Sequence, residues 1–242
     1  MINWTEMTQD PVDTKVREMV LDYLFSIRRT LPNNNYDTYL KNNVYEKRVL
    51  DIGVCEHVVE RMRSKNWKHK MIVKNAGYTL GVDILPELIS ELNQTGYNVV
   101  ECDATSDVFL GEEFDVVHIG DVIEHVSSPI LLIEFALRHL KEGGKVIVRT
   151  PNAYCFDYVY KNKKIGTDQS NLEHMFYILP THALEIARRT DSVFSAYYVQ
   201  ARRGLIHCLY QLTKGNFRHA FAEIFSKPEQ YSTIFCYEFT KK

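Results

Sequence analysis

The chain has 242 residues, of which 45% are apolar, and a formal net charge of −2 at pH 7. This length supports one sizeable core, and the charge excludes a global basic field that would draw the chain onto nucleic acid. The five cysteines are widely spaced without a CxxC pair, which favours reduced thiols over a disulfide frame or a structural zinc site. The sequence shows neither a signal peptide nor an apolar run as long as a membrane span. These features predict a cytoplasmic, single-domain protein (1–242) without a transmembrane segment.

The first 47 residues carry helical patterns. Between residues 14 and 31, apolar side chains recur at helical spacing, and Pro32 with three asparagines ends the pattern. A weaker helical segment follows. We therefore expect residues 1–47 to form an N-terminal helical cap on the main domain.

Short apolar runs then alternate with helical patterns, and several of the runs end near an aspartate. Strands separated by helices predict a doubly wound, mostly parallel sheet with helices on both faces. Two further strand patterns lie near the carboxyl terminus, which makes seven strands in a Rossmann-like α/β fold. The expected strands are 48–53, 78–84, 97–104, 114–121, 145–152, 192–200 and 231–240.

The region before the last strand is too long for an ordinary hairpin turn. Residues 201–230 contain two amphipathic patterns, and long insertions of this kind are often functional lids. We expect a cofactor-binding core at 48–200, a helical insert or lid at 201–230, and a last strand at 231–242.

Acidic residues and glycines recur at four consecutive strand ends, namely Asp51–Gly53, Asp83, Asp103 and Gly120–Asp121. Each aspartate alone is explained by turn formation or helix capping. In an open parallel sheet, however, ligands bind outside the carboxyl ends of the strands. Four such residues in register on one rim therefore indicate a ligand site.

These motifs resemble the class I S-adenosylmethionine-dependent methyltransferases over roughly residues 45–200, especially branches that act on glycans and small molecules. The matching stretches are VLDIGVCEH, GVDIL, CDA, the glycine before GDVIEHV, and LKEGGKVIVRTPN. In the first motif only Gly53 is kept, because Cys55 and His57 stand at the other glycine positions. The missing GxGxxG weakens a dinucleotide-binding alternative.

The resemblance implies S-adenosylmethionine as cofactor and gives each strand end a part of it. On this resemblance, Asp51 faces the ammonium group and Gly53 lets the backbone approach the cofactor closely. Asp83, which Ile84 follows, accepts both ribose hydroxyls, and Asp103 with the backbone of Ala104 holds the adenine. Gly120 and Asp121 lie by the methionine and methyl groups.

The stretch GDVIEHVSSP places Asp121, Glu124 and His125 beside the expected methyl group. One hypothesis gives Glu124 and His125 a pocket-shaping role, with His125 as the best candidate for the base and His174 as the second. The other is a divalent metal site formed by Asp121, Glu124, His125 and His174, which resembles that of small-RNA 2′-O-methyltransferases and ubiquinone-pathway enzymes. Such ligands suit Mn²⁺, Fe²⁺ or Zn²⁺ better than Mg²⁺. His118, in mid-strand, is expected to be a satisfied core or surface histidine, and His69 is a weaker candidate.

The function expected from these features is O-methylation of a hydroxyl on a saccharide or glycan intermediate. The basic residues at 61–63, 68–70 and 202–203 are each expected to lie on a solvated surface. If they face the pocket together, they would suit an anionic acceptor. Two alternatives stay open. The first is a metal-dependent RNA ribose 2′-O-methyltransferase, which the calculated pI of 6.5 disfavours, and the second is a non-catalytic cofactor-binding protein.

Overall fold

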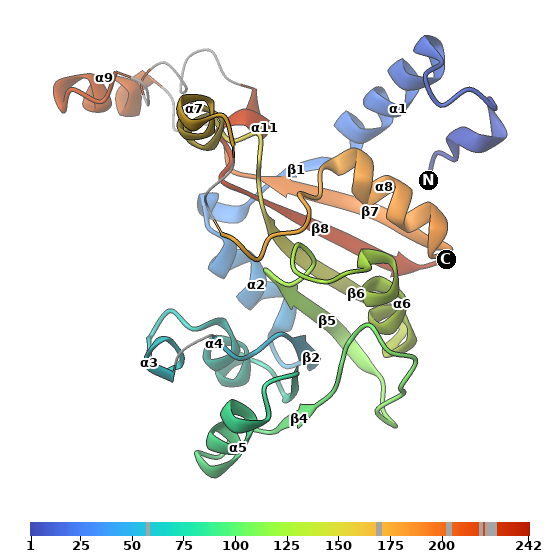
Figure 1. Ribbon diagram of the computed structural model, residues 1–242, viewed down its shortest axis with the longest axis vertical. Coiled ribbons are helices and arrows are strands. Elements are labelled where there is room, and N and C mark those ends of the chain that lie inside the picture. Colours follow the sequence, from blue (N-terminus) through green and yellow to red (C-terminus); the bar gives the residue numbers. More distant parts are fainter. Residues whose placement is uncertain (57–58, 168–170, 202–204, 218–219, 221–226) are drawn as a thin grey trace.

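A computed structural model describes residues 1–56, 59–167, 171–201, 205–217, 220 and 227–242. Its centre is an eight-stranded sheet in the order β1-β7-β8-β6-β5-β2-β3-β4 (Figure 1). The strands are β1 Arg28–Thr30, β2 Arg48–Ile52, β3 Tyr78–Asp83, β4 Val99–Glu101, β5 Phe114–Gly120, β6 Leu140–Pro151, β7 Ser192–Val199 and β8 Ile234–Lys241.

The sheet is mostly parallel, as predicted. Strand β8 is antiparallel to both of its neighbours, β6 and β7, and the remaining pairs are parallel. The order reverses next to β2, so the carboxyl ends of β2 and β5 meet at the point where open α/β sheets bind ligands.

The described residues form eight strands in this sheet, one more than the seven expected. The helix expected at 14–31 ends at Ile27, and Arg28–Thr30 pair with β7 as the edge strand β1. Helical backbone is disfavoured directly before Pro32, and the edge of β7 offers hydrogen bonds to an extended chain instead. The segment 1–47 is therefore not purely helical, and part of it belongs to the sheet.

Helices cover both faces of the sheet (Figure 1). Helices α1, α6 and α8 contribute to the larger apolar cluster, α2 and α4 pack on the opposite face, and α5 joins a third cluster near β4. The helices are α1 Thr14–Ile27, α2 Tyr36–Val44, α3 Val59–Met62, α4 Lys68–Asn75, α5 Pro86–Gln94, α6 Pro129–Arg138, α7 Phe156–Ile165, α8 Pro180–Arg189, α9 Leu205–Thr213 and α11 Pro228–Tyr231, with 3₁₀ turns η1 Trp4–Glu6 and η2 Pro32–Asn34.

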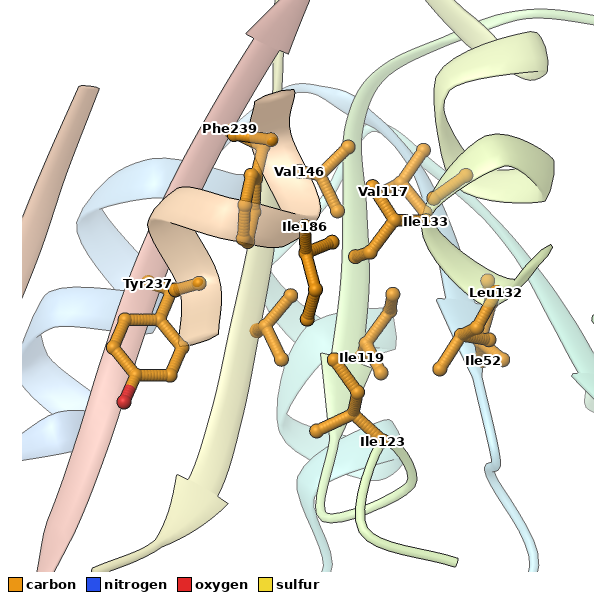
Figure 2. Packing of buried hydrophobic residues seen from close by; sticks show 14 of the residues in the cluster. Ile52, Val117, Ile119, Ile123, Leu132, Ile133, Val146, Ile186, Tyr237 and Phe239 are labelled. Atoms are coloured by element: carbon orange, nitrogen blue, oxygen red, sulfur yellow. The ribbon is translucent and has the colours of Figure 1, made fainter. Parts of the chain in front are cut away.

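Alternate residues of the central strands serve opposite faces, because successive side chains of a strand point to opposite sides. Val117 and Ile119 pack among Leu132, Ile133 and Ile186 in the larger cluster, and Figure 2 shows them between the sheet and the helices. The residue between them on β5, His118, points to the opposite face of the sheet, where its ring contacts Asp51 and Tyr36.

The insert before β8 is helical in its described part, as predicted. It contains α9 and α11, while residues 202–204, 218–219 and 221–226 lie outside the described residues. Its function as a lid and the division into domains stay predictions. Among the described residues, no helix has the length and apolar character needed to cross a membrane.

Candidate active site

A pocket of about 310 Å³ opens at the carboxyl ends of the central strands. Six of the predicted site residues line it: Gly53, Asp83, Ile84, Asp103, Ala104 and His125. Its other lining residues, which the sequence did not single out, are Ile52, Val82, Cys102, Thr105, Val122, Val126 and Ser127.

The loop after β2 approaches its neighbours closely at Gly53. This residue has φ of +75°, and a Cβ added there would lie 2.2 Å from Cγ2 of Val122. Its N–H donates to the Val82 carbonyl at 2.8 Å. Only glycine fits both the conformation and the space. His57, at another glycine position of the expected motif, lies outside the described residues.

Cys55 occupies a glycine position without blocking the loop. Its N–H donates to Oδ2 of Asp83 at 2.7 Å, so the backbone of the first loop is tied to the second strand end. Burial, followed by the nearby Asp83 carboxylate, raises the pKa of the Cys55 thiol to about 12. The thiol is therefore protonated at neutral pH and behaves as a small apolar side chain.

Asp83 and Asp103 carry the acidic groups of the pocket. Oδ1 of Asp83 accepts from the N–H of Ile84 at 2.8 Å, and Asp83 is only 7% exposed. Oδ1 of Asp103 accepts from both the N–H and the hydroxyl of Thr105, at 2.8 and 2.6 Å, which lowers the pKa of Asp103. Both side chains are thus held in fixed orientations at the rim.

Asp51 and Gly120 lie near the pocket but do not line it. Asp51 is 3% exposed, and both of its oxygens are bonded to buried histidines, His69 and His118. A Cβ at Gly120 would meet Cε1 of His118 at 2.7 Å, so this glycine makes room for the ring. The expectation of a core histidine at 118 agrees with this arrangement.

The side chain of Asp121 points towards Arg149 and not towards the other three predicted metal ligands. It has φ of +56°, pairs with the guanidinium of Arg149, and donates its N–H to the Arg149 carbonyl at 2.9 Å. Within the part of the chain that the structure describes, ligand atoms gather at Glu124, His125 and His174, and Asp121 is not part of this group.

Glu124, His125 and His174 form a compact cluster next to the pocket. One ligand atom from each residue lies within 4.8 Å of the other two, and Nε2 of His174 lies 4.0 Å from Oε1 of Glu124. The N–H groups of Met175 and Phe176 lie 2.8 and 3.3 Å from the Glu124 carbonyl oxygen, which accepts from both. These backbone bonds hold the loop of His174 against the segment after β5.

Glu124 is fully buried. Oε2 accepts from the hydroxyl of Thr150 at 3.1 Å, whereas Oε1 accepts no hydrogen bond from the described part of the chain. Burial, only partly offset by bonds from its own backbone and from Thr150, raises the pKa of Glu124 to about 7. A buried carboxyl oxygen in this state is available to a proton or a cation. Sequence reasoning missed Thr150, because the stretch LKEGGKVIVRTPN was matched to the family without a role for this residue.

The cluster fits a divalent cation by the chemistry of its donors. One carboxylate and two imidazoles suit Mn²⁺, Fe²⁺ or Zn²⁺, and the available oxygen of Glu124 is the kind of atom that a cation satisfies. Ligand atoms about 2.1 Å from one ion lie about 3–4 Å apart, and the three ligand atoms here, within 4.8 Å of one another, are close to that spacing.

The fold and the rim of acidic strand ends define a Rossmann-like domain with a nucleotide-type pocket. A family model described as "Methyltransferase domain" matches residues 24–221. The chain belongs to this methyltransferase family, which confirms the resemblance seen in the sequence.

Curated relatives match part of the chain. A "Ubiquinone biosynthesis O-methyltransferase" of Pseudomonas fluorescens is 28% identical over 141 residues, covering 52% of this chain and 57% of that protein. The chain thus spans little more than half the length of this relative. An uncharacterized protein of Methanocaldococcus jannaschii is 38% identical over 69 residues, which cover 28% of this chain and 34% of that protein.

Solved structures agree on the fold. A SAM-dependent methyltransferase of Thermotoga maritima has a TM-score of 0.54 at 18% identity, covering 85% of this chain and 87% of that one. One from Archaeoglobus fulgidus also scores 0.54, at 17% identity, with 93% and 94% covered. At these identities the likeness shows the fold of S-adenosylmethionine-dependent methyltransferases.

Proposed function

We propose that the protein transfers the methyl group of S-adenosylmethionine to a hydroxyl oxygen. The observation that carries this proposal is the position of His125, which lines the pocket and also belongs to the cluster with Glu124 and His174. A group that can accept a proton is therefore adjacent to a pocket of the kind that binds the cofactor. Family membership and the O-methyltransferase relatives support the same reaction.

In this proposal the strand ends divide the cofactor between them. The Asp83 carboxylate accepts the ribose hydroxyls beside Ile84, and Asp103 with Ala104 binds the adenine. The Ile52–Gly53 backbone faces the methionine part, because both residues line the pocket. The remaining predicted residues do not line the pocket and support this lining from behind, namely Asp51, Gly120 and Asp121.

The reaction needs alignment and the removal of one proton. The sulfonium of the cofactor is already a good leaving group, so much of the rate comes from holding the acceptor oxygen in line with the methyl group. As the new bond forms, His125 accepts the hydroxyl proton. Glu124 and His174 keep His125 oriented and form one polar surface for the acceptor.

A divalent metal is the alternative to His125 acting as the base, because an imidazole that coordinates an ion cannot also accept the hydroxyl proton. Glu124, His125 and His174 would hold it, since the buried Oε1 of Glu124 accepts no hydrogen bond from the described residues. When bound, such an ion lowers the pKa of an acceptor hydroxyl.

The class of acceptor depends on the surroundings of this cluster. The saccharide or glycan acceptor expected from the sequence stays a prediction. Exposed apolar side chains flank His174, with Leu172 96% exposed, Met175 61% and Phe176 37%. These side chains favour an acceptor that carries its hydroxyl beside an apolar group. An RNA acceptor has in its favour the cluster of Glu124, His125 and His174 and the exposed basic residues of the 61–70 region.

The test is transfer of tritiated methyl from S-adenosylmethionine to fractionated cell extract, with and without chelator. Label in a small-molecule, organic-soluble fraction supports the proposed acceptor, label in glycan restores the saccharide prediction, and label in nuclease-sensitive material favours RNA. Loss of transfer with chelator, restored by Mn²⁺, supports the metal. Cofactor binding without transfer to any fraction would leave a non-catalytic binding protein instead.

A further inference from the structure

Asp51 has a different environment from the other acidic strand ends. It lies inside the sheet, opposite Gly81 on β3 and His118 on β5 in the strand register. Nδ1 of His118 lies 2.5 Å from Oδ1, and Nδ1 of His69, from helix α4, lies 2.8 Å from Oδ2. A buried carboxylate is tolerated only when its oxygens are bonded, and here two imidazole N–H groups satisfy both.

The neighbouring glycines make room for these two rings. A Cβ at Gly120 would lie 2.7 Å from Cε1 of His118, and a Cβ at Gly81 would lie 3.0 Å from Cε1 of His69. Both histidines are 1% exposed. Gly81 and Gly120 therefore leave space for the two histidines that bond to the buried Asp51.

Further contacts connect this site to the loop after β5. The hydroxyl of Tyr36 lies 2.8 Å from Nε2 of His118, and the guanidinium of Arg149 lies over the Tyr36 ring, 5.5 Å from its centre. Arg149 pairs with Asp121, and the next residue, Val122, lies so close to Gly53 that no side chain fits there. The contacts thus join the two loops that line the pocket.

Helix α4 is fastened to the first loop at a second point. The indole N–H of Trp67, directly before α4, donates to the Val54 carbonyl at 2.8 Å. The rings of Trp67 and Tyr97 lie 5.3 and 5.5 Å from the ring of His69. The start of α4 therefore has its position fixed relative to residues 51–54.

We propose that His69 and His118 are positioning residues of the cofactor pocket. Their N–H groups hold the Asp51 carboxylate, and Asp51 in turn holds the Ile52–Gly53 backbone that lines the pocket. Asp51 then acts on the cofactor through the backbone, and its side chain does not face the ammonium group. The consequence for cofactor binding rests on the proposed function, whereas the effect on the loop is independent of it.

The experiment compares an N–H donor with an apolar side chain at each histidine. Asn keeps an N–H near the position of Nδ1, and Leu removes it. We would measure the affinity for S-adenosylhomocysteine by calorimetry, and hydrogen exchange of peptides covering residues 48–56 without cofactor. The matched control is His139→Leu, a fully buried histidine bonded to the Phe135 carbonyl and the Leu110 N–H on the other face of the sheet.

For His69→Leu and His118→Leu we expect faster exchange of the 48–56 peptides and an affinity lower by about tenfold, the scale of one hydrogen bond to a charged group. His69→Asn and His118→Asn restore both properties, and His139→Leu lowers the melting temperature alone. If a Leu variant does not fold, we would use Gln in its place. The amide of Gln lies one methylene group farther from the backbone than that of Asn, so its N–H is displaced from the position of Nδ1.

Two results would overturn the inference: folded Leu or Gln variants with wild-type exchange and affinity, or Asn variants as impaired as Leu. If the wild type does not bind S-adenosylhomocysteine, the proposed function fails, and the exchange measurement still decides whether the histidines hold the loop.

Discussion

In the proposed function, the cofactor side and the acceptor side of the pocket come from different parts of the chain. On the cofactor side, Gly53, Asp83 and Asp103 each lie at the end of a strand or within two residues of it, and each bonds to nearby backbone. On the acceptor side, Glu124 and His125 meet His174, which comes from the loop between α7 and α8. The first side is fixed by the sheet, and the second depends on a long-range contact. Substitutions should therefore affect binding on one side and turnover on the other.

The largest expected effect is on the acceptor side. Glu124→Gln keeps the shape of the side chain but removes the carboxyl group that is available to a proton or a cation, so we expect turnover to fall by about 10²–10⁴-fold with an unchanged affinity for S-adenosylhomocysteine. Steady-state kinetics with calorimetry check this, and Glu142→Gln, at an exposed glutamate, is the control. If Glu124→Gln turns over normally, Glu124 has no part in the reaction.

On the cofactor side, Gly53→Ala should cause the largest loss of binding. The methyl group would lie 2.2 Å from Val122, at a φ of +75°, so we expect an affinity for S-adenosylhomocysteine lower by about 100-fold or more. The matched control is Gly96→Ala, where φ is +91° but no atom lies within 4 Å of the new Cβ. It should lose about 1 kcal/mol of stability and bind normally. Equal binding losses in both would show that backbone strain alone is responsible.

A smaller effect is expected from the hydroxyl that supports Glu124. Thr150→Val removes the donor to Oε2 while keeping the volume, so the affinity for Mn²⁺ should fall by about tenfold. Thr79→Val is the control, because the Thr79 hydroxyl is buried and has no partner among the described residues. Titration with Mn²⁺ measures both variants, and an unchanged Thr150→Val would remove this residue from the site.

The smallest effect is a pH dependence of stability. Burial alone would raise the pKa of Asp51, but the bonds from His118 and His69 hold it at about 2, below the ordinary value of 3.8. The carboxylate therefore stabilises the fold above about pH 4, and this contribution, about 2 kcal/mol, is lost as the pH falls towards 2. Urea unfolding from about pH 5 to 3 should show a steeper loss in the wild type than in Asp51→Asn. Parallel slopes would contradict the low pKa.

The difference between the two sides also explains what the sequence could predict. Alternating strands and helices, with Gly53, Asp83 and Asp103 at strand ends, follow from local patterns, so the fold and the gathering of these three residues at one pocket were predictable. The edge strand at Arg28–Thr30 was not, because its pairing with β7 overrides a local helical pattern. His174 was proposed by resemblance.

Roles set by side-chain direction were the least accessible to sequence reasoning. Asp51 and Asp121 stand at the expected strand ends, but buried histidines bind one and Arg149 pairs with the other. Thr150 and His69 reach their partners from different elements, and no local spacing indicates such contacts.

The central claim is that the pocket at the strand ends binds S-adenosylmethionine through Asp83. The direct measurement is calorimetric titration of wild type and Asp83→Ala with S-adenosylhomocysteine. Asp83 lines the pocket and also holds the N–H groups of Cys55 and Ile84. We therefore expect saturable binding to the wild type and an affinity lower by about 100-fold in the variant. No binding to the wild type, or equal affinity in the two proteins, would contradict this account of the pocket.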